Sequence, residues 1–257
     1  MSSLKKAIDV LSCFSTELPN LSVTEVAKRT SLSKSGASRL MVQMAELGLL
    51  YRAENERKYG PGSLLLQLGA VFEQRMELLP IVESEVVSAV RLTGRTGYIG
   101  ALNGSEIVAL RTIQGREQVR FVLEAGQKLA AHKTSLGKAL LARLSNDEIR
   151  QRYSQDLGAP VSHAPTSFSE LFDELDQVRV SLVAEAEVAT IPGARGIGAA
   201  VGDSSNNESA TIGFSLSYLE DGASSRTRFE TQSYTKRIAR NVAKISGDPI
   251  WSVIKSA

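Results

Sequence analysis

Residues 22–40, SVTEVAKRTSLSKSGASRL, predict two short helices joined by a tight turn. Ser22 stands three residues before Glu25, which is the spacing of a capping box at a helix start. Ser33 can cap the following helix, because a serine hydroxyl accepts from a free backbone N–H of the first turn. The apolar face of that helix carries five residues at helical spacing: Ala37, Leu40, Met41, Met44 and Leu47. This arrangement is typical of a helix-turn-helix, whose second helix enters the major groove of DNA.

The polar side of the second helix carries residue types that suit contacts with DNA. Serine hydroxyls reach base edges or phosphates, lysine neutralises phosphates, and arginine can also bind guanine through two parallel hydrogen bonds. The candidate DNA-binding residues of this helix are Ser33, Lys34, Ser35, Ser38, Arg39 and Gln43. From spacing alone, a solvated basic face on an ordinary three-helix unit remains the alternative.

A preceding helix and a following wing complete this N-terminal pattern. Apolar residues at helical spacing predict a helix over residues 4–14, with the lone Cys13 buried on its apolar side. After Gly48, residues 49–59 predict two short strands with residues 54–56 at the bend. The basic residues of this wing are candidates for contacts with the DNA backbone or minor groove: Arg52, Arg57 and Lys58. The order helix, helix, helix and wing favours DNA binding.

Composition excludes several classes of protein. One cysteine and two histidines among 257 residues cannot supply a disulfide framework or a zinc-finger site. The apolar stretches are broken by charges well before the roughly 20 residues that a membrane helix needs, and the N-terminus lacks the apolar region of a signal peptide. We therefore expect a cytoplasmic protein with no membrane association, no metal and no cofactor.

The distribution of charge is more informative than its total. The formal net charge is only +2. Residues 1–62 carry nine basic and six acidic residues, so this segment is mildly basic and the remainder is close to neutral. A basic segment of this kind permits a local contact with nucleic acid, although it does not establish one.

Two separated regions of the sequence resemble the IclR family of bacterial transcriptional regulators. The first comprises residues 22–40, 46–50, 58–64 and 68–69, and the second is residues 126–142, GQKLAAHKTSLGKALLA. The resemblance implies a mainly α winged helix-turn-helix over residues 1–62 and a linker helix over residues 63–77. Residues 78–257 would then form an effector-binding GAF-like domain of the α+β class with an antiparallel sheet.

The residues themselves support each part of this architecture. The linker has an apolar stripe that predicts packing on another subunit, in a homodimer or homotetramer: Leu64, Leu65, Leu68, Val71 and Phe72. Asn103-Gly104 between two β-rich runs, 96–102 and 106–114, predicts a hairpin. Alternation over residues 212–217 predicts a half-buried strand, and helices are expected from Ser169 to about Ala186 and from about Ser224 to Ile245.

A candidate effector site lies at the start of the helix predicted over residues 136–144. Free N–H groups and partial positive charge at a helix start favour a carboxylate, and the resemblance implies a small organic or aromatic acid. The candidate residues are Thr134, Ser135, Gly137, Arg195 and Gly196. In the bland alternative, Thr134 is only a helix cap, Arg195 faces solvent, and His132 is a hydrogen-bonded structural residue. The run 188–201 departs from the family's usual pattern, with Val188 and Ala189 in place of a glutamate pair.

The sequence contains only incomplete versions of known enzyme motifs, so we expect no catalytic residues. Gly137-Lys138 lacks the first glycine and the following hydroxyl residue of a phosphate-binding loop, and Gly196-Ile-Gly198 lacks the third glycine of a dinucleotide fingerprint. The sequence predicts a regulator that binds double-stranded DNA at a palindromic operator and senses a small molecule. The alternative is a ligand-sensing or oligomerisation protein that does not bind DNA.

Overall fold

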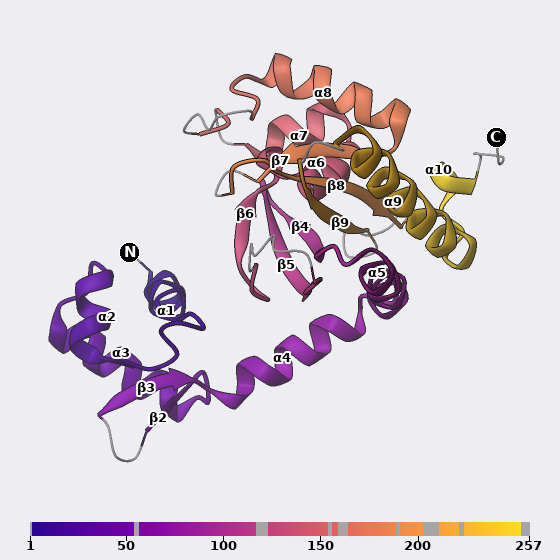
Figure 1. Cartoon of the computed structure of the whole chain (residues 1–257). Helices are drawn as coiled ribbons and strands as arrows, with labels where there is room; N and C mark the ends of the chain where they lie inside the picture. The colour runs from indigo at the N-terminus through magenta and orange to yellow at the C-terminus, as the bar shows by residue number, and fades with distance from the viewer. Residues whose placement is uncertain are drawn as a thin grey trace. The chain divides into compact units, whose positions relative to one another are not determined.

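The computed structural model describes residues 2–53, 57–116, 123–153, 156–158, 164–188, 191–202, 211–220 and 224–252. The chain divides into two compact units, Met1–Arg75 and Met76–Ala257 (Figure 1). Within the described ranges, no helix has both the length and the apolar character that a membrane crossing requires.

The first unit consists of short helices and a small three-stranded sheet. Its elements are α1 (Ser3–Leu11), β1 (Leu21–Ser22), α2 (Val23–Arg29), α3 (Lys34–Glu46), β2 (Leu50–Arg52), β3 (Lys58–Pro61) and α4 (Ser63–Gln74). The strands pair antiparallel in the order β1-β3-β2. The helix-turn-helix and the strands of the wing are therefore confirmed, while the predicted bend at 54–56 lies outside the described residues.

Local hydrogen bonds explain where α2 and α3 begin. The Ser22 hydroxyl accepts from the Glu25 N–H, and the Glu25 carboxylate accepts from the Ser22 N–H at 2.7 Å, which confirms the predicted capping box. Ser33 caps α3, as predicted, by accepting from the Gly36 N–H. Behind these caps the buried core of the unit is formed by Val10, Leu21, Val26, Met41, Met44, Leu50 and Tyr59.

Three predictions for this unit need correction at helix ends. Helix α1 ends at Leu11 instead of residue 14, so Cys13 lies beyond the helix and is half-buried, not buried. The Cys13 thiol donates to the Asp9 carbonyl oxygen, and burial raises its pKa. Leu47, predicted on the apolar face of α3, is 69% exposed because it sits past the last helical residue, where the chain turns toward Gly48.

Helix α4 has an apolar surface with no buried residue. Leu66, Leu68, Val71 and Phe72 are among the exposed large hydrophobic residues of the chain. The helix forms where the linker was predicted, and the packing of its stripe on another subunit stays a prediction.

The second unit is built on a six-stranded antiparallel sheet. Its elements are α5 (Leu79–Thr93), β4 (Gly97–Asn103), β5 (Glu106–Ile113), β6 (Lys128–Ala130), the 3₁₀ turn η1 (Ala131–Lys133), α6 (Ser135–Leu141), α7 (Asn146–Arg152), α8 (Phe168–Ser181), β7 (Ala184–Glu187), β8 (Ala194–Val201), β9 (Ile212–Leu219), α9 (Ser224–Ser246) and α10 (Pro249–Ser252). The strand order is β6-β5-β4-β9-β8-β7. The predicted hairpin is confirmed as β4 and β5, which turn at Gly104 with a positive φ of 62°.

Helices cover both faces of this sheet, so the unit has two cores (Figure 1). Residues of α5 and α9 pack with Ile99, Phe214 and Leu216 on one face. Residues of α6, α7 and α8 pack with Tyr98, Ile107 and Ala200 on the other face. We call these the α9 face and the α6 face.

Two predictions for the second unit are wrong for reasons of tertiary packing. Strand β9 is not half-buried, because Gly213, Ser215 and Ser217 on its second side are buried as well. The helix predicted from Ser169 to Ala186 ends at Ser181, after which Leu182 adopts a left-handed conformation. Residues 184–187, with strong helix formers, instead form β7 because they pair with β8, and pairing overrides the local preference.

Candidate functional site

Helix α3 presents its polar side to solvent in the manner expected of a recognition helix. Ala37, Met41 and Met44 point into the core, which fixes the rotation of the helix. Among the predicted residues, Ser33, Lys34, Ser35, Arg39 and Gln43 are exposed and Ser38 is half-buried. The structure thus places all six residues on α3 and its N-cap, with five of them exposed.

The cations at the start of α3 are not neutralised within the chain. In the described part of the structure, neither Lys34 nor Arg39 forms an ion pair, and the first turn of α3 contains no acidic residue. The helix start also carries partial positive charge from its free N–H groups. This end of α3 can therefore attract an anion such as a phosphate.

The wing adds three basic residues on the β2–β3 ribbon. Arg52 is exposed and its guanidinium lies 6.0 Å from the centre of the Tyr59 ring, which pairs with it across the ribbon. Arg57 is exposed, with a positive φ of 44°. Lys58 is half-buried and helps to hold the pKa of Glu25 below its ordinary value, after the larger effect of hydrogen bonds from Ser22.

Helix α6 begins with a cap but has an environment opposite to that of α3. The Thr134 hydroxyl oxygen accepts from the Gly137 N–H at 3.0 Å, and every residue of the helix is buried. Gly137 is required for this packing, because a Cβ atom there would lie 2.3 Å from the Ala131 carbonyl oxygen. Thr134 is therefore at least a helix cap, which is the purely structural alternative for this residue.

Glycines of β8 allow the start of α6 to lie directly on the sheet. A Cβ atom at Gly196 would be 2.7 Å from the Ser135 hydroxyl oxygen, and one at Gly198 would be 2.8 Å from the backbone of Leu136. Four of the five candidate effector residues, Thr134, Ser135, Gly137 and Gly196, therefore lie together on the α6 face.

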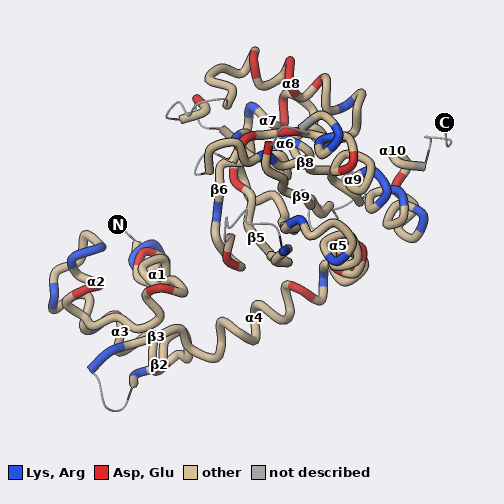
Figure 2. The backbone as a smooth tube through the Cα atoms, viewed as in Figure 1, with Lys and Arg blue, Asp and Glu red and all other residues tan. Residues whose placement is uncertain are grey.

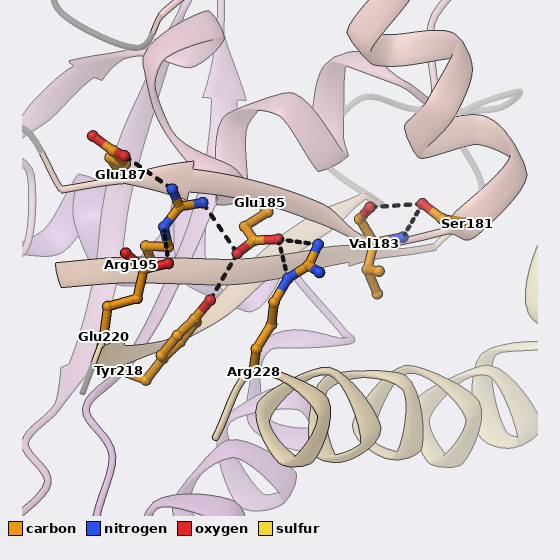
Figure 3. A network of polar contacts seen from close by, with 8 residues as sticks. All are labelled: Ser181, Val183, Glu185, Glu187, Arg195, Tyr218, Glu220 and Arg228. Atoms are coloured by element: carbon orange, nitrogen blue, oxygen red, sulfur yellow. Dashed lines mark hydrogen bonds and ion pairs between the residues drawn. The ribbon is translucent and has the colours of Figure 1, made fainter. Parts of the chain in front are cut away.

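Arg195 points away from the other four candidates. Successive residues of a strand face opposite sides of a sheet, and Arg195 lies on the α9 face (Figure 3). Its guanidinium contacts Glu187 at 3.0 Å, Glu220 at 2.9 Å and Glu185 at 3.4 Å. The Arg195 side chain is 30% exposed and its guanidinium is engaged by three carboxylates on the α9 face, so it does not join the other four residues and the single five-residue cluster expected from sequence does not form.

Glu185 is the centre of the polar network around Arg195. It accepts from the Tyr218 hydroxyl at 2.7 Å and from Arg228 Nε at 2.7 Å, which ties the start of α9 to the edge of the sheet (Figure 3). Burial works to raise the pKa of Glu185, but these hydrogen bonds outweigh it and hold the pKa below its ordinary value. The two arginines of the network are thus engaged by the carboxylates of Glu185, Glu187 and Glu220 within the chain.

Sequence reasoning missed three polar residues that face α6. Tyr98, Ser215 and Ser217 are buried on that face, where Tyr98 and Ser215 are paired between β4 and β9. Burial raises the pKa of Tyr98 to about 12, against the opposing effect of a hydrogen bond with Ser217. The alternation over residues 212–217 predicts a half-buried strand, which leaves its small and polar positions in solvent, whereas the structure buries them.

His132 is more weakly hydrogen-bonded than expected. It is buried in η1, its ring meets the Tyr153 ring edge-on, and its Nδ1 lies 3.4 Å from the Tyr153 hydroxyl oxygen. Its Nε2 has no hydrogen-bond partner in the described structure. Burial, assisted by Lys133 and Lys138, lowers the pKa of His132 to about 4, so the ring is neutral at physiological pH.

Comparison with known families identifies both units. The family described as "Bacterial transcriptional regulator IclR C-terminal" matches residues 73–247, and the "IclR helix-turn-helix domain" matches residues 3–54. The chain belongs to the IclR family. The matched ranges include α3, the start of α6 and strands β7 to β9.

Individual IclR-family proteins are distant in sequence but similar in fold. The HTH-type transcriptional regulator KdgR of Dickeya chrysanthemi is 29% identical over 180 residues, which is 70% of this chain and 59% of KdgR. The structure of an IclR regulator from Silicibacter sp. TM1040 has a TM-score of 0.79 at 17% identity, covering 97% of this chain and 99% of that one. An IclR homologue from Microbacterium hydrocarbonoxydans in complex with 4-hydroxybenzoate has a TM-score of 0.73 at 20% identity, covering 95% and 100% of the two chains.

The two IclR family matches fall in the two units that carry the two candidate sites. The curated relatives are transcriptional regulators and not enzymes, and no cluster of metal-ligating side chains occurs among the described residues. The family thus carries a helix-turn-helix and an effector domain, whereas the residues that contact DNA or ligand in this chain must be inferred from its own geometry.

Proposed function

We propose that this chain is a cytoplasmic transcriptional regulator that binds an operator in double-stranded DNA through α3 and the wing. The observation that carries the proposal is the exposed, unneutralised cationic start of α3. Lys34 and Arg39 project from a helix that is anchored by Met41 and Met44, so their positions are held by the core. A rigid helix with free cations fits the major groove, where arginine reads guanine and lysine neutralises phosphate.

The mode of binding follows from the size of one recognition helix. A single helix reads only a few base pairs, so specific binding calls for two copies on half-sites about one helical turn apart. A palindromic operator matches the two-fold symmetry of a homodimer, and a homotetramer would engage two such pairs. The exposed apolar stripe of α4 supports the association of copies next to the DNA-binding unit.

The DNA-binding part is tested with duplexes selected by the full-length protein from a random-sequence pool. Arg39→Ala should raise the Kd for the selected duplex by about 5- to 150-fold, which corresponds to the loss of one bidentate contact with guanine. Arg91→Ala, which removes an exposed arginine from α5 in the other unit, is the matched control and should leave the Kd unchanged.

The salt dependence of the same measurement separates the two candidate functions. A DNA-binding regulator releases counterions, so log Kd should rise steeply with log salt concentration. If no duplex is enriched, or if Arg39→Ala binds as tightly as the wild type, α3 is not the recognition helix. The alternative of a ligand-sensing or oligomerisation protein would then be favoured.

We further propose that the α6 face of the second unit binds a small organic acid as effector. The start of α6 offers partial positive charge, and buried hydroxyls of Ser135, Ser215 and Tyr98 on this face can hydrogen-bond a polar ligand. The effector-binding residues would be Thr134, Ser135, Gly137 and Gly196, with the carboxylate held at the helix start. Effector binding would alter the separation of the two recognition helices on the operator.

A thermal-shift series tests the effector site, with 4-hydroxybenzoate and a panel of other small carboxylic acids as probes. A ligand that binds only the folded state raises the melting temperature in a concentration-dependent manner. Thr134→Val should reduce that shift while leaving the Kd for DNA unchanged. A carboxylic acid that stabilises the wild type and Thr134→Val equally would place the effector elsewhere.

A further inference from the structure

A cavity of about 210 Å³ lies at the end of α6 that is opposite to the proposed effector site. Its walls come from the second half of α6 and the residues just after it, the end of α8, strand β8 and α10. Thr134 at the start of α6 and Ala142 on the cavity wall are about 12 Å apart along the helix axis, given the α-helical rise. The cavity is therefore a separate site, and what it binds does not rest on the proposed function.

Most of the cavity wall is apolar. Ala139, Val178 and Ala200 are buried, and Leu182 is half-buried. Ile250 also lines the cavity and is 41% exposed, so the cavity can be reached from solvent. An apolar cavity of about 150 Å³ is large enough to bind benzene, so this one has room for a single aromatic ring.

The side chain of Trp251 forms one wall of the cavity and is fixed by a hydrogen bond. Its indole N–H donates to the Ala200 carbonyl oxygen at 2.9 Å, and the residue is buried. Because the N–H is engaged by the backbone, the indole offers the cavity only its apolar ring surface. Two aromatic rings in contact gain stability beyond that of the buried area, so this wall favours an aromatic ligand over an aliphatic one.

Two arginines on the cavity wall already have partners for their N–H groups. Arg143 donates to the Asp248 carboxylate at 2.8 Å. Arg179 donates to the Ala142 carbonyl oxygen at 3.3 Å and to the Asp176 carboxylate at 2.6 Å. An arginine engaged in this way along its edges still offers its planar face, which attracts the π-surface of an aromatic ring.

The charges around the cavity favour an uncharged ligand over an anion. Each of the two arginines is paired with a carboxylate, and the Asp248 side chain is fully buried. Helix α8, which supplies one wall, carries four acidic residues and one basic residue, and Figure 2 shows the acidic ones as red segments. A carboxylate ligand would have to displace an existing ion pair beside an acidic helix.

We propose that this cavity binds an uncharged molecule with a single aromatic ring. The ring packs on Trp251 and on the guanidinium faces of the two arginines, and a polar substituent stays in solvent beside Ile250. A ring in this position contacts α6, α8, β8 and α10 at once, so the ligand stabilises the second unit.

Phenol is the probe, and the full-length chain reports its own occupancy because Trp251 is the only tryptophan. In a proton–nitrogen NMR spectrum, the single indole N–H signal should shift with phenol concentration and saturate, with a Kd on the order of 1 mM for so small a ligand. Benzoate should bind about 10-fold more weakly or worse, since its carboxylate loses water next to cations that are already paired. Benzoate binding as tight as that of phenol would make the cavity an anion site and overturn the proposal.

Two variants place the bound phenol in this cavity. Ala142→Leu puts a larger side chain into the cavity and should weaken phenol binding by about 10-fold or more. Ile250→Ala removes part of the apolar wall at the opening and should weaken it by about 3-fold, so the test does not depend on Ala142→Leu alone. Ala70→Leu, the same change at an exposed position of α4, is the matched control and should leave phenol binding unchanged.

Circular dichroism should show that the three variants remain folded. The absence of a saturable shift of the indole signal in the wild type would overturn the proposal. Unchanged phenol affinity in the folded cavity variants would overturn it as well, because the phenol would then bind elsewhere on the chain.

Discussion

Helices α3 and α6 begin with the same local pattern and end up in opposite environments. Each follows a hydroxyl residue whose oxygen accepts from the N–H of a glycine three positions later: Ser33 from Gly36 at 3.2 Å, and Thr134 from Gly137 at 3.0 Å. Helix α3 then exposes its first turn, whereas all seven residues of α6 are buried. A cap therefore defines where a helix begins without defining what the helix meets.

The difference lies in the residues that follow each cap. In α3, lysine and arginine alternate with small residues, so one side must remain in solvent. In α6, most residues are small or apolar, the polar Ser135 and Lys138 are buried with them, and the glycines of β8 let its start approach the sheet. One pattern thus yields an exposed helix start and the other a buried one.

The two glycines provide the largest expected contrast. Gly137→Ala places a Cβ atom 2.3 Å from the Ala131 carbonyl oxygen, and the backbone must shift, so we expect the free energy of unfolding to fall by about 3 kcal/mol or more. At Gly36 the nearest atom is the exposed Ser33 Oγ at 3.1 Å. Gly36→Ala should therefore change stability by less than about 1 kcal/mol, since Ala is the better helix former.

Urea unfolding monitored by Trp251 fluorescence reports the second unit, because this buried residue is the only tryptophan of the chain. Hydrogen exchange of α3 amides reports the first unit. If Gly137→Ala were as stable as the wild type, the close packing of α6 on η1 would be wrong.

The pH dependence of stability should differ between the surroundings of the two helix starts. His132, buried next to α6, has its pKa lowered from 6.5 to about 4, chiefly by burial. Between these two pKa values the unfolded chain binds a proton at His132 and the folded chain does not. The stability contributed by the neutral, buried ring is therefore fully present above pH 6.5 and is lost as the pH falls toward 4. Between pH 6.5 and 4.5 the second unit should lose about 2–3 kcal/mol of stability.

Denaturation of wild type and His132→Gln at several pH values checks this expectation. The variant should lack most of the slope in that range, because glutamine does not titrate. The glutamates with lowered pKa values, such as Glu25 and Glu148, act only below their ordinary value of 4.5 and do not confuse the result. An equal slope in both proteins would assign the pH dependence to another group.

Removal of the cap should destabilise α6 more than α3, by a smaller margin than the two glycine substitutions. Thr134→Val leaves the Gly137 N–H without its acceptor inside a buried helix, and an unsatisfied buried donor costs about 2 kcal/mol. Ser33→Ala exposes the Gly36 N–H to water instead, so the loss should be about 1 kcal/mol or less. Equal losses of stability, measured by the same urea titrations and hydrogen exchange, would show that burial does not increase the contribution of the cap hydrogen bond.

Local signals predicted the helix starts of both regions, and long-range contacts explain what was missed. The capping box at Ser22, the caps at Ser33 and Thr134 and the turn at Gly104 depend on neighbours in sequence. The three carboxylates around Arg195 come from β7 and from the residue after β9, so no pattern local to Arg195 in the sequence predicts them. Burial of the second side of β9 likewise depends on α6, about 70 residues earlier in the chain.

The smallest expected effect concerns Lys34, which faces solvent at the start of α3. Lys34→Ala should leave the stability of both units unchanged within about 0.5 kcal/mol, because the side chain is exposed and makes no ion pair among the described residues. If Lys34 contacts a phosphate, the slope of log Kd for DNA against log salt concentration should become shallower by about 0.9. Lys128→Ala, which removes an exposed lysine from β6, should leave that slope unchanged. A slope unaffected by Lys34→Ala would place the phosphate contacts on the wing. The exposed start of α3 would then contact base edges and not the DNA backbone.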